Sequence, residues 1–467
     1  MWLRKCRRWT GLSSSKMMQS VMGNGGLWKR WLTLLVLFMI CMVFYYMLSN
    51  MGMPNHVKFS SSKWLPYTYQ DFKDKKWFES NCIGSIELNE FEDLKEIIES
   101  WKKSSSKDCR NMYLMFIKLL RITFDEAEVV FSDTFSGQVK KWLNNDDALY
   151  DQAKKQLIIS AYNVYTREHN MYNPIRGKRP MSIPDVPEKT YIEQLVRKTQ
   201  PTCDFCNYKS HTAQDVFDRI DNKLSYSASN TFKLDRWHGL FMLKTHHPLN
   251  WTKEQFLDLM DTGQQWFKKV YAREGWYKYP SGIWDLLPHA GASQVHPHIH
   301  GFLDRDSYQG VTEVWRQAAI EYNQDVPHHN YFIDIIEIHS MLGLTVSYGK
   351  AVAFANLVPK RDNEIVIVSE KADEDFFLLW YFVVRGFLDD MECLCYSTGF
   401  ALPSMTGDTS SSSLPAYVRI LTRGAVADVR SDISSLELFT ASNANTDPYK
   451  VINVMRASVS KRGKTSR

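Results

Sequence analysis

The stretch that decides the fold is Gly291-Ala-Ser-Gln-Val-His296-Pro-His298-Ile-His300-Gly-Phe-Leu303, in which three histidines occupy alternating positions. Alternate side chains of an extended strand point to the same face, so we expect the three imidazoles to share one face. Three adjacent titratable rings suit a core poorly, because each needs a hydrogen-bond partner and the protonated forms repel one another. The pattern therefore favours a reaction site, with a polar surface strand or a fortuitous metal site as the alternative.

Cysteine and histidine also cluster upstream of this stretch. Cys203-Asp-Phe-Cys206 has the spacing of half a zinc site or of a redox pair. A strand-like run, Gly239 to Lys244, is followed by His246 and His247. Neighbours on a strand face opposite sides, so the sequence leaves open which of these two histidines faces the cysteines.

The triad and its flanks resemble a known signature. His296-Pro-His298-Ile-His300, preceded by Gly291 and Ser293, is similar to the motif of the HIT (histidine triad) superfamily and most similar to its galactose-1-phosphate uridylyltransferase branch. The stretch from Asn173 to Pro180 resembles a segment near the start of that branch. The resemblance implies an α+β fold built on a duplicated antiparallel sheet with flanking helices.

The resemblance also implies roles for individual residues. His298 would attack the α-phosphorus of a nucleotide and form a covalent nucleotidyl-histidine, with one ring nitrogen held by an acceptor such as a backbone carbonyl. Ser293 would donate a hydrogen bond to a phosphate oxygen or the leaving group. His296 and His300 complete the catalytic set, and substrate binding falls to Gly291, Gln294, Asp285 and Arg176.

Two departures from the branch qualify this function. His300 stands where the branch has glutamine, and histidine can protonate a leaving group, which favours a hydrolase or a transferase with a non-standard acceptor. Asp285 stands about where the branch has asparagine, and its carboxylate would repel a phosphate unless protonated or metal-bound. An inactive nucleotide-binding or scaffold protein is therefore one alternative function. A redox protein that uses Cys203 and Cys206 is another.

In the same branch, two cysteines and two histidines hold a structural zinc. Transferred to this chain, the ligands are Cys203, Cys206, His247 or His246, and His296, a set that suits tetrahedral Zn²⁺. A disulfide between Cys203 and Cys206 is the rival interpretation. Elsewhere in the chain, Cys82 and Cys109 form a candidate disulfide pair.

The second half of the chain repeats the pattern of strands and helix without a triad. Strands expected at 352–359 and 364–368 and a helix at 374–391 follow the order of the strand at 240–243 and the helix at 253–271. His339, expected on a strand, and the polar run Arg419 to Arg423 with Arg430 and Asp432 could contact a sugar or phosphate. The alternative is that these residues form the solvated face of a strand.

Composition bounds the remaining possibilities. The 467 residues, 44% hydrophobic, suit a two-lobed globular protein. The net charge of +5 comes from residues 1–30, which hold seven basic and no acidic residues, so we expect no nucleic-acid partner. P-loop, dinucleotide-binding, zincin and serine-hydrolase motifs do not occur.

Eighteen uncharged residues, Trp31 to Leu48, predict a helix of roughly 27 Å that anchors the chain in a membrane. The positive-inside rule predicts a single-pass type II protein whose C-terminal body lies in the lumen of the Golgi or endoplasmic reticulum. The expected partners are a nucleotide or nucleotide-sugar substrate, the membrane and a second copy of the chain. The predicted organisation is a cytoplasmic basic tail (1–30), the anchor (31–49), a stalk (50–75), a helical region with helices near 88–101 and 148–163 (76–195), the half with triad and zinc motif (196–310), the half without triad (311–460) and a basic tail (461–467).

Overall fold

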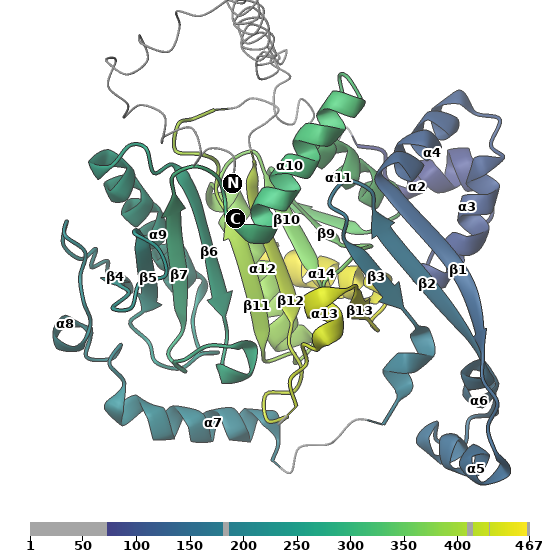
Figure 1. Ribbon diagram of the computed structural model, residues 1–467, viewed down its shortest axis with the longest axis horizontal. Helices are drawn as coiled ribbons and strands as arrows, with labels where there is room; N and C mark the ends of the chain where they lie inside the picture. The colour runs from purple at the N-terminus through teal and green to yellow at the C-terminus, as the bar shows by residue number, and fades with distance from the viewer. Residues whose placement is uncertain (1–71, 181–185, 409–413, 429, 465–467) are drawn as a thin grey trace, which may run out of the picture. The chain divides into compact units, whose positions relative to one another are not determined.

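The computed structural model describes residues 72–180, 186–408, 414–428 and 430–464. The chain divides into two units, Met1–Ser60 and Ser61–Arg467, and every described residue belongs to the second. The fold is mixed α+β, as the sequence predicts. Its main element is a sheet of nine strands in the order β4-β5-β7-β6-β11-β12-β10-β9-β8, with all neighbours antiparallel (Figure 1). The strands are β4 Ser225–Ser229, β5 His238–Leu243, β6 Tyr279–Asp285, β7 His298–Asp304, β8 Thr345–Tyr348, β9 Ala351–Ala355, β10 Ile365–Ser369, β11 Tyr396–Ala401 and β12 Ala416–Thr422.

The order strand-strand-helix-strand-strand occurs twice in this sheet. The first copy is β4-β5-α9-β6-β7 with α9 at Lys253–Arg273, and the second is β9-β10-α12-β11-β12 with α12 at Glu374–Arg385. The copies meet where β6 pairs with β11, with Ile283 opposite Gly399 at the middle of the pairing. From the sequence, the strand at Val352 is the expected counterpart of the strand at Leu240. In the sheet, the counterpart of β5 is β10, because each is the second strand of its copy.

The helix-covered face of the first copy is packed closely enough to require glycine. A Cβ on Gly239 of β5 would lie 2.6 Å from the ring of Trp266 on α9, and one on Gly301 of β7 would lie 2.5 Å from the ring of Phe241. Only hydrogen at these positions lets the aromatic rings of the core approach the sheet. The odd-numbered residues of β5 and β7 therefore face α9, and the even-numbered residues, including His298 and His300, face away from it.

A second sheet has the order β1-β2-β3-β13, with β1 at Leu120–Glu128, β2 at Lys155–Asn163, β3 at His169–Tyr172 and β13 at Ser442–Ala444. The helix predicted over 148–163 is wrong in its second part: α6 ends at Lys154 and β2 follows. The run Leu157-Ile158-Ile159 explains the change, because branched side chains favour a strand and Ile159 pairs with Phe124 of β1. The remaining helices are α2 Lys75–Phe78, α3 Leu94–Lys102, α4 Lys107–Leu119, α5 Asp133–Trp142, α6 Asp147–Lys154, α7 Glu188–Thr199, α8 Tyr208–His211, α10 Gly310–Asp325, α11 Tyr331–Met341, α13 Ser435–Phe439 and α14 Pro448–Gly463.

The structure tests the predicted disulfide between Cys82 and Cys109 and the predicted strand position of His339. Cys82 and Cys109 form the predicted disulfide, with 5.4 Å between their Cα atoms. His339, expected on a strand, lies on α11 and is fully buried. Its Nδ1–H donates to the Ile335 carbonyl (2.7 Å) and its Nε2 accepts from the Leu357 amide, so His339 is a hydrogen-bonded core residue and contacts no ligand.

The prediction of a single-pass membrane protein with a lumenal Golgi or endoplasmic reticulum body is not supported by the structure. Within the part of the chain that the structure describes, no helix combines the length and apolar character needed to cross a membrane. The predicted anchor, residues 31–49, the tail 1–30 and the stalk as far as residue 71 lie outside the described residues. The apolar helices α11 and α12, which the structure does describe, are packed in the core.

A buried ion cluster joins the two sheets. Arg419 of β12 lies opposite Gly399 of β11, and His300 of β7 lies opposite Ile283 of β6. Arg419 therefore occupies in the second copy the position that His300 occupies in the first copy. Its guanidinium contacts Glu364 (2.7 Å) and Glu168 (2.6 Å), the latter in the connection between β2 and β3. Arg419 was a candidate for sugar or phosphate contact, but both of its carboxylate partners are buried within the protein.

We expect Arg419→Leu to lower the free energy of unfolding by about 3–5 kcal/mol, because it leaves Glu364 buried without a countercharge and leaves Glu168 only the more distant Lys360 amine (3.4 Å). Urea unfolding followed by circular dichroism measures the change. Lys189→Ala is the matched control, because it removes the exposed Lys189–Glu392 pair and should leave the midpoint nearly unchanged. Equal midpoints for Arg419→Leu and the unsubstituted protein would show that this cluster does not stabilise the fold.

Candidate active site and metal site

The triad lies at the start of β7, on the face of the sheet turned away from α9. His298 pairs with Met242 and His300 pairs with Leu240, both on β5. His296 lies two residues before His298, outside the strand, and its ring faces Cys203 and Cys206. The predicted common face of one extended strand therefore holds for His298 and His300, and His296 is not part of that strand.

The ring of His298 is held in one tautomer. Its Nδ1 lies 2.9 Å from the carbonyl oxygen of His296, and because a carbonyl only accepts, Nδ1 carries the proton. The lone pair of Nε2 is then free. Burial lowers the pKa of His298, so the ring is neutral near pH 7. Only 3% of the residue is exposed.

His300 is oriented by a histidine that the sequence did not single out, His238, the first residue of β5. The amide of Leu234 donates to His238 Nδ1 (3.2 Å), so His238 carries its proton on Nε2, and the nearest acceptor of that proton is His300 Nδ1 (2.9 Å), with the side-chain amide nitrogen of Asn230 farther away (3.3 Å). His300 therefore presents Nε2–H. Burial lowers the pKa of His238 to about 4 and that of His300 to about 3, so both rings are neutral. The alternation of His238, Leu240 and Met242 along β5 was the available signal for His238.

Asp285 is the last residue of β6. The pairing of β6 with β7 ends at Ile283 and His300, and Asp285 lies two residues farther along β6, on the same face as Ile283 and toward the start of β7. The hydroxyl of Ser397 donates to Asp285 Oδ1 (2.6 Å), and Arg423 donates to Ser397 Oγ (3.0 Å). Burial raises the pKa of Asp285, and Ser397 and Arg423 partly offset this effect.

The turn between β6 and β7 carries the other predicted phosphate-binding residues. Gly291 has a φ of +116°, which favours glycine, and its missing side chain leaves room beside Asp285 Oδ2. Ser293 is exposed and Gln294 is half-buried. Their side chains are thus available on the turn that leads into His296 and His298.

A cavity of about 560 Å³ lies beyond this turn. Arg423 connects the two, because it lines the cavity and donates to the Ala290 carbonyl (2.7 Å). Buried side-chain atoms of four lining residues have no hydrogen-bond partner among the described residues: His289 Nε2, Arg361 Nε, Asn363 Oδ1 and Asn445 Oδ1. The predicted substrate residue Arg176 is part of the lining. The charged and histidine lining residues are Arg176, Arg179, His289, Arg361, Asp362, Arg423, Asp428, Arg430, Asp432 and Glu437.

Four side chains next to the triad form a group that could hold a metal ion: the ligand atoms of Cys203, Cys206, His246 and His296 lie within 4.8 Å of one another. His296 Nε2–H donates to the Leu243 carbonyl (2.6 Å), so its Nδ1, 3.6 Å from both sulfur atoms, is unprotonated. His246 Nε2–H donates to Thr199 Oγ1 (3.1 Å), and its Nδ1 lies 3.4 Å from Cys206 Sγ.

This group corrects one predicted ligand and fits a cation. His247 points elsewhere: its Nε2 lies 3.1 Å from Glu193 Oε1 and its Nδ1 accepts from the Leu249 amide. Burial and the neighbouring Cys203 raise the pKa of the Cys206 thiol to about 12. Two thiolates in this position need a positive partner, which a metal ion would supply. The geometry thus favours His246 over His247.

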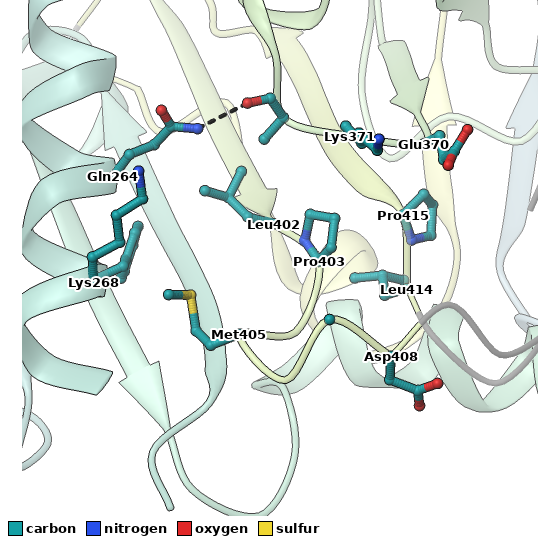
Figure 2. A pocket seen from close by; sticks show the side chains of 13 residues that line it. Gln264, Lys268, Glu370, Lys371, Leu402, Pro403, Met405, Asp408, Leu414 and Pro415 are labelled. Carbon is teal, nitrogen blue, oxygen red and sulfur yellow. Dashed lines mark hydrogen bonds between the residues drawn. The ribbon is translucent and has the colours of Figure 1, made fainter. Parts of the chain in front are cut away.

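A separate cavity of about 410 Å³ lies between α9, the residues that follow β10 and the connection from β11 to β12. Figure 2 shows the side chain of Gln264 bonded to the carbonyl of Ala372 on one side, with Leu402, Pro403 and Met405 below. Its lining is mostly apolar, with Lys268, Glu370, Lys371 and Asp408 among the polar members. No triad or metal-group residue lines this cavity.

Known proteins were compared with this chain by sequence and by structure. No protein-family model and no curated protein matches the sequence. Among solved structures, an ADP-glucose phosphorylase from Arabidopsis thaliana with bound ADP-glucose has a TM-score of 0.48 at 14% identity, over 64% of this chain and 98% of that chain. A GalT-like protein from Arabidopsis thaliana has a TM-score of 0.44 at 14% identity, over 55% and 91%. A uridylyltransferase has a TM-score of 0.41 at 13% identity, over 52% and 86%.

The triad predicted a likeness to the galactose-1-phosphate uridylyltransferase branch, and the similar solved structures include a GalT-like protein, a uridylyltransferase and an ADP-glucose phosphorylase. Because these identities and TM-scores are low, the chemistry of this chain must be argued from the residues of its own site.

We expect the purified chain to hold close to one metal ion, measured by elemental mass spectrometry. His246→Ala should lower the metal content after dialysis against a chelator, because it removes one of the four protein ligands and opens the shell to water. His247→Ala is the matched control and should retain it. Loss of metal in His247→Ala with retention in His246→Ala would overturn the assignment.

Proposed function

We propose that this chain is an enzyme with a duplicated histidine-triad fold that hydrolyses or transfers a nucleotidyl group through a covalent intermediate on His298. One observation carries the proposal: Nδ1 of His298 is held by the His296 carbonyl, which leaves Nε2 of a neutral ring as a free nucleophile. A histidine with only a packing role does not need this tautomer beside a second oriented histidine.

In the first step, His298 Nε2 attacks the α-phosphorus of a nucleotide or nucleotide sugar. The P–N bond forms, the bond from phosphorus to the leaving oxygen breaks, and the leaving group takes the electron pair. His300 Nε2–H donates a hydrogen bond to a phosphate oxygen or the leaving oxygen. Because the pKa of His300 is lowered to about 3, the ring has no second proton to give near pH 7. His300 thus acts as a neutral donor and does not by itself favour hydrolysis.

In the second step, an acceptor oxygen attacks the same phosphorus, and the electron pair of the P–N bond returns to Nε2. Ser293 and Gln294, on the turn before the triad, are placed to donate to phosphate oxygens. The arginine-lined cavity beyond this turn suits an anionic acceptor or leaving group that bears a phosphate. The orphaned buried atoms of His289 and Arg361 in that cavity indicate that a polar ligand completes their hydrogen bonding.

The metal is proposed to be structural Zn²⁺, held by Cys203, Cys206, His246 and His296. When bound, it would fix the position of His296. The carbonyl of this residue holds the tautomer of His298, so metal binding and nucleophile orientation would depend on one residue.

A catalytically silent nucleotide-binding or scaffold protein is the second candidate. The carboxylate of Asp285 beside His298 and the 3% exposure of His298 favour it. A redox function is less favoured, because His246 and His296 both turn an unprotonated nitrogen toward Cys203 and Cys206.

Incubation with nucleotides and nucleotide sugars labelled at the α-phosphate should give an acid-labile, base-stable adduct on the peptide that contains His298. His298→Asn should abolish it, while His339→Asn, at a histidine outside the site, should retain it. Mass spectrometry of the intact protein and its peptides is the measurement. Absence of an adduct with every nucleotide tested would support the silent binding protein.

Adduct formation should fall as the pH rises through the raised pKa of Asp285, because the carboxylate then repels the bound phosphate. Asp285→Asn should remove this decline and increase adduct formation at pH 8 about tenfold, which corresponds to about 1.4 kcal/mol of like-charge repulsion. Asp306→Asn, at an exposed carboxylate, is the control. A slower Asp285→Asn variant at pH 8 would instead make Asp285 a required group.

A further inference from the structure

Phe205 covers the ring of His298. The ring centroids of Phe205 and His298 are 5.3 Å apart at an interplanar angle of 63°, and Phe205 also lies 5.8 Å from the ring of His296. With Phe205 in this position, His298 is 3% exposed. A phosphorus atom that approaches His298 Nε2 therefore meets a site that this aromatic ring helps to close.

The ring belongs to an apolar layer on the triad face of the sheet. Tyr226 and Ala228 of β4 and Leu240 and Met242 of β5 form a buried cluster, and Phe205 packs against it. Water is excluded from such a layer, because its surface offers few hydrogen-bond partners. Removal of the Phe205 ring would expose this side of His298 to solvent.

The position of Phe205 depends on the metal group. Phe205 lies between Cys203 and Cys206, whose sulfur atoms are both 3.6 Å from His296 Nδ1. A metal ion bound there would tether the loop on each side of the ring. Without the metal, the loop keeps the hydrogen bond from the Tyr226 hydroxyl to the Phe205 carbonyl (2.5 Å) and its own turn hydrogen bond from the Cys206 amide to the Cys203 carbonyl (3.1 Å).

We propose that Phe205 is a movable cover, held by the metal-binding loop, that shields nucleotidyl-His298 from water and so directs the nucleotidyl group to a bound acceptor. Phe205 is then a specificity-determining residue of the site. The proposal rests on the function proposed above and deepens it, because it makes the chain a transferase and not a hydrolase.

The two competing reactions share one bond cleavage. In transfer to inorganic phosphate, a phosphate oxygen bonds to phosphorus, the P–N bond breaks, and the electron pair returns to His298 Nε2. In hydrolysis, the water oxygen forms the new bond and its proton passes to solvent. Phe205 does not alter the balance of either reaction and affects only which oxygen reaches the phosphorus.

A chemical probe tests the cover without requiring catalysis. Diethyl pyrocarbonate acylates neutral imidazole nitrogen, and peptide mass spectrometry measures its rate at His298. In the zinc-loaded protein, Phe205→Ala should raise this rate at least about tenfold, as expected if the covered state otherwise predominates. Chelation of the metal should raise the rate similarly, with no further increase in chelated Phe205→Ala.

Two control variants separate loss of the ring over His298 from a general effect on folding. Phe205→Tyr keeps a ring over His298 and should retain slow acylation. Phe135→Ala, at a partly exposed phenylalanine on α5, should behave as the unsubstituted protein. Equal acylation rates at His298 in Phe205→Ala and the unsubstituted protein would overturn the proposal.

Partition of the covalent adduct tests the specificity. With a labelled nucleotide and inorganic phosphate as the acceptor probe, Phe205→Ala should raise the ratio of hydrolysis to transfer at least about tenfold. An unchanged ratio would reject Phe205 as the specificity residue even if the acylation rate rises. If the unsubstituted protein forms no adduct, the proposed function fails, the specificity role fails with it, and acylation alone decides whether Phe205 covers His298.

Discussion

The geometry of the site depends on one residue, His296, which contacts four neighbours. Its Nε2–H is bonded to the carbonyl of Leu243, its Nδ1 faces Cys203 and Cys206, and its own carbonyl accepts from His298. The ring and the main chain of one residue therefore connect the metal group, strand β5 and the proposed nucleophile. A shift of this residue would change the ligand set and the tautomer of His298 together, which explains why the two sites lie side by side.

The two copies of the strand-strand-helix-strand-strand order have diverged at equivalent positions. In the first copy His300 is partly exposed, and in the second Arg419 is buried between Glu364, which precedes β10, and Glu168, which lies between β2 and β3. A buried cation in this position needs carboxylate partners, and one of the two comes from the smaller sheet. The second copy thus uses the face of its sheet for packing, whereas the first keeps the same face for chemistry.

The local patterns were predictable and the long-range contacts were not. Alternation on β7, the Cys203–Cys206 spacing and the helical periodicity of α9 and α12 are properties of short segments. The choice of His246 over His247 depends on where Thr199 and Glu193 lie, and the strand at Leu157 depends on pairing with β1. Likewise, His238 and the arginine-lined cavity exist only through pairings between distant segments. The predicted single-pass membrane protein is not supported, because no helix among the described residues can cross a membrane.

The main-chain amide of Leu234 determines which ring nitrogens of His238 and His300 carry a proton. The side chains of Phe232 and Leu234 are 87% and 80% exposed, whereas Lys233 between them contacts Asp215 and the His238 carbonyl. Because any residue except proline supplies that amide, positions 232 and 234 of the hairpin between β4 and β5 can change without disturbing the histidines at its base. Such a loop is a natural place for evolution to alter substrate preference while the reaction itself is conserved.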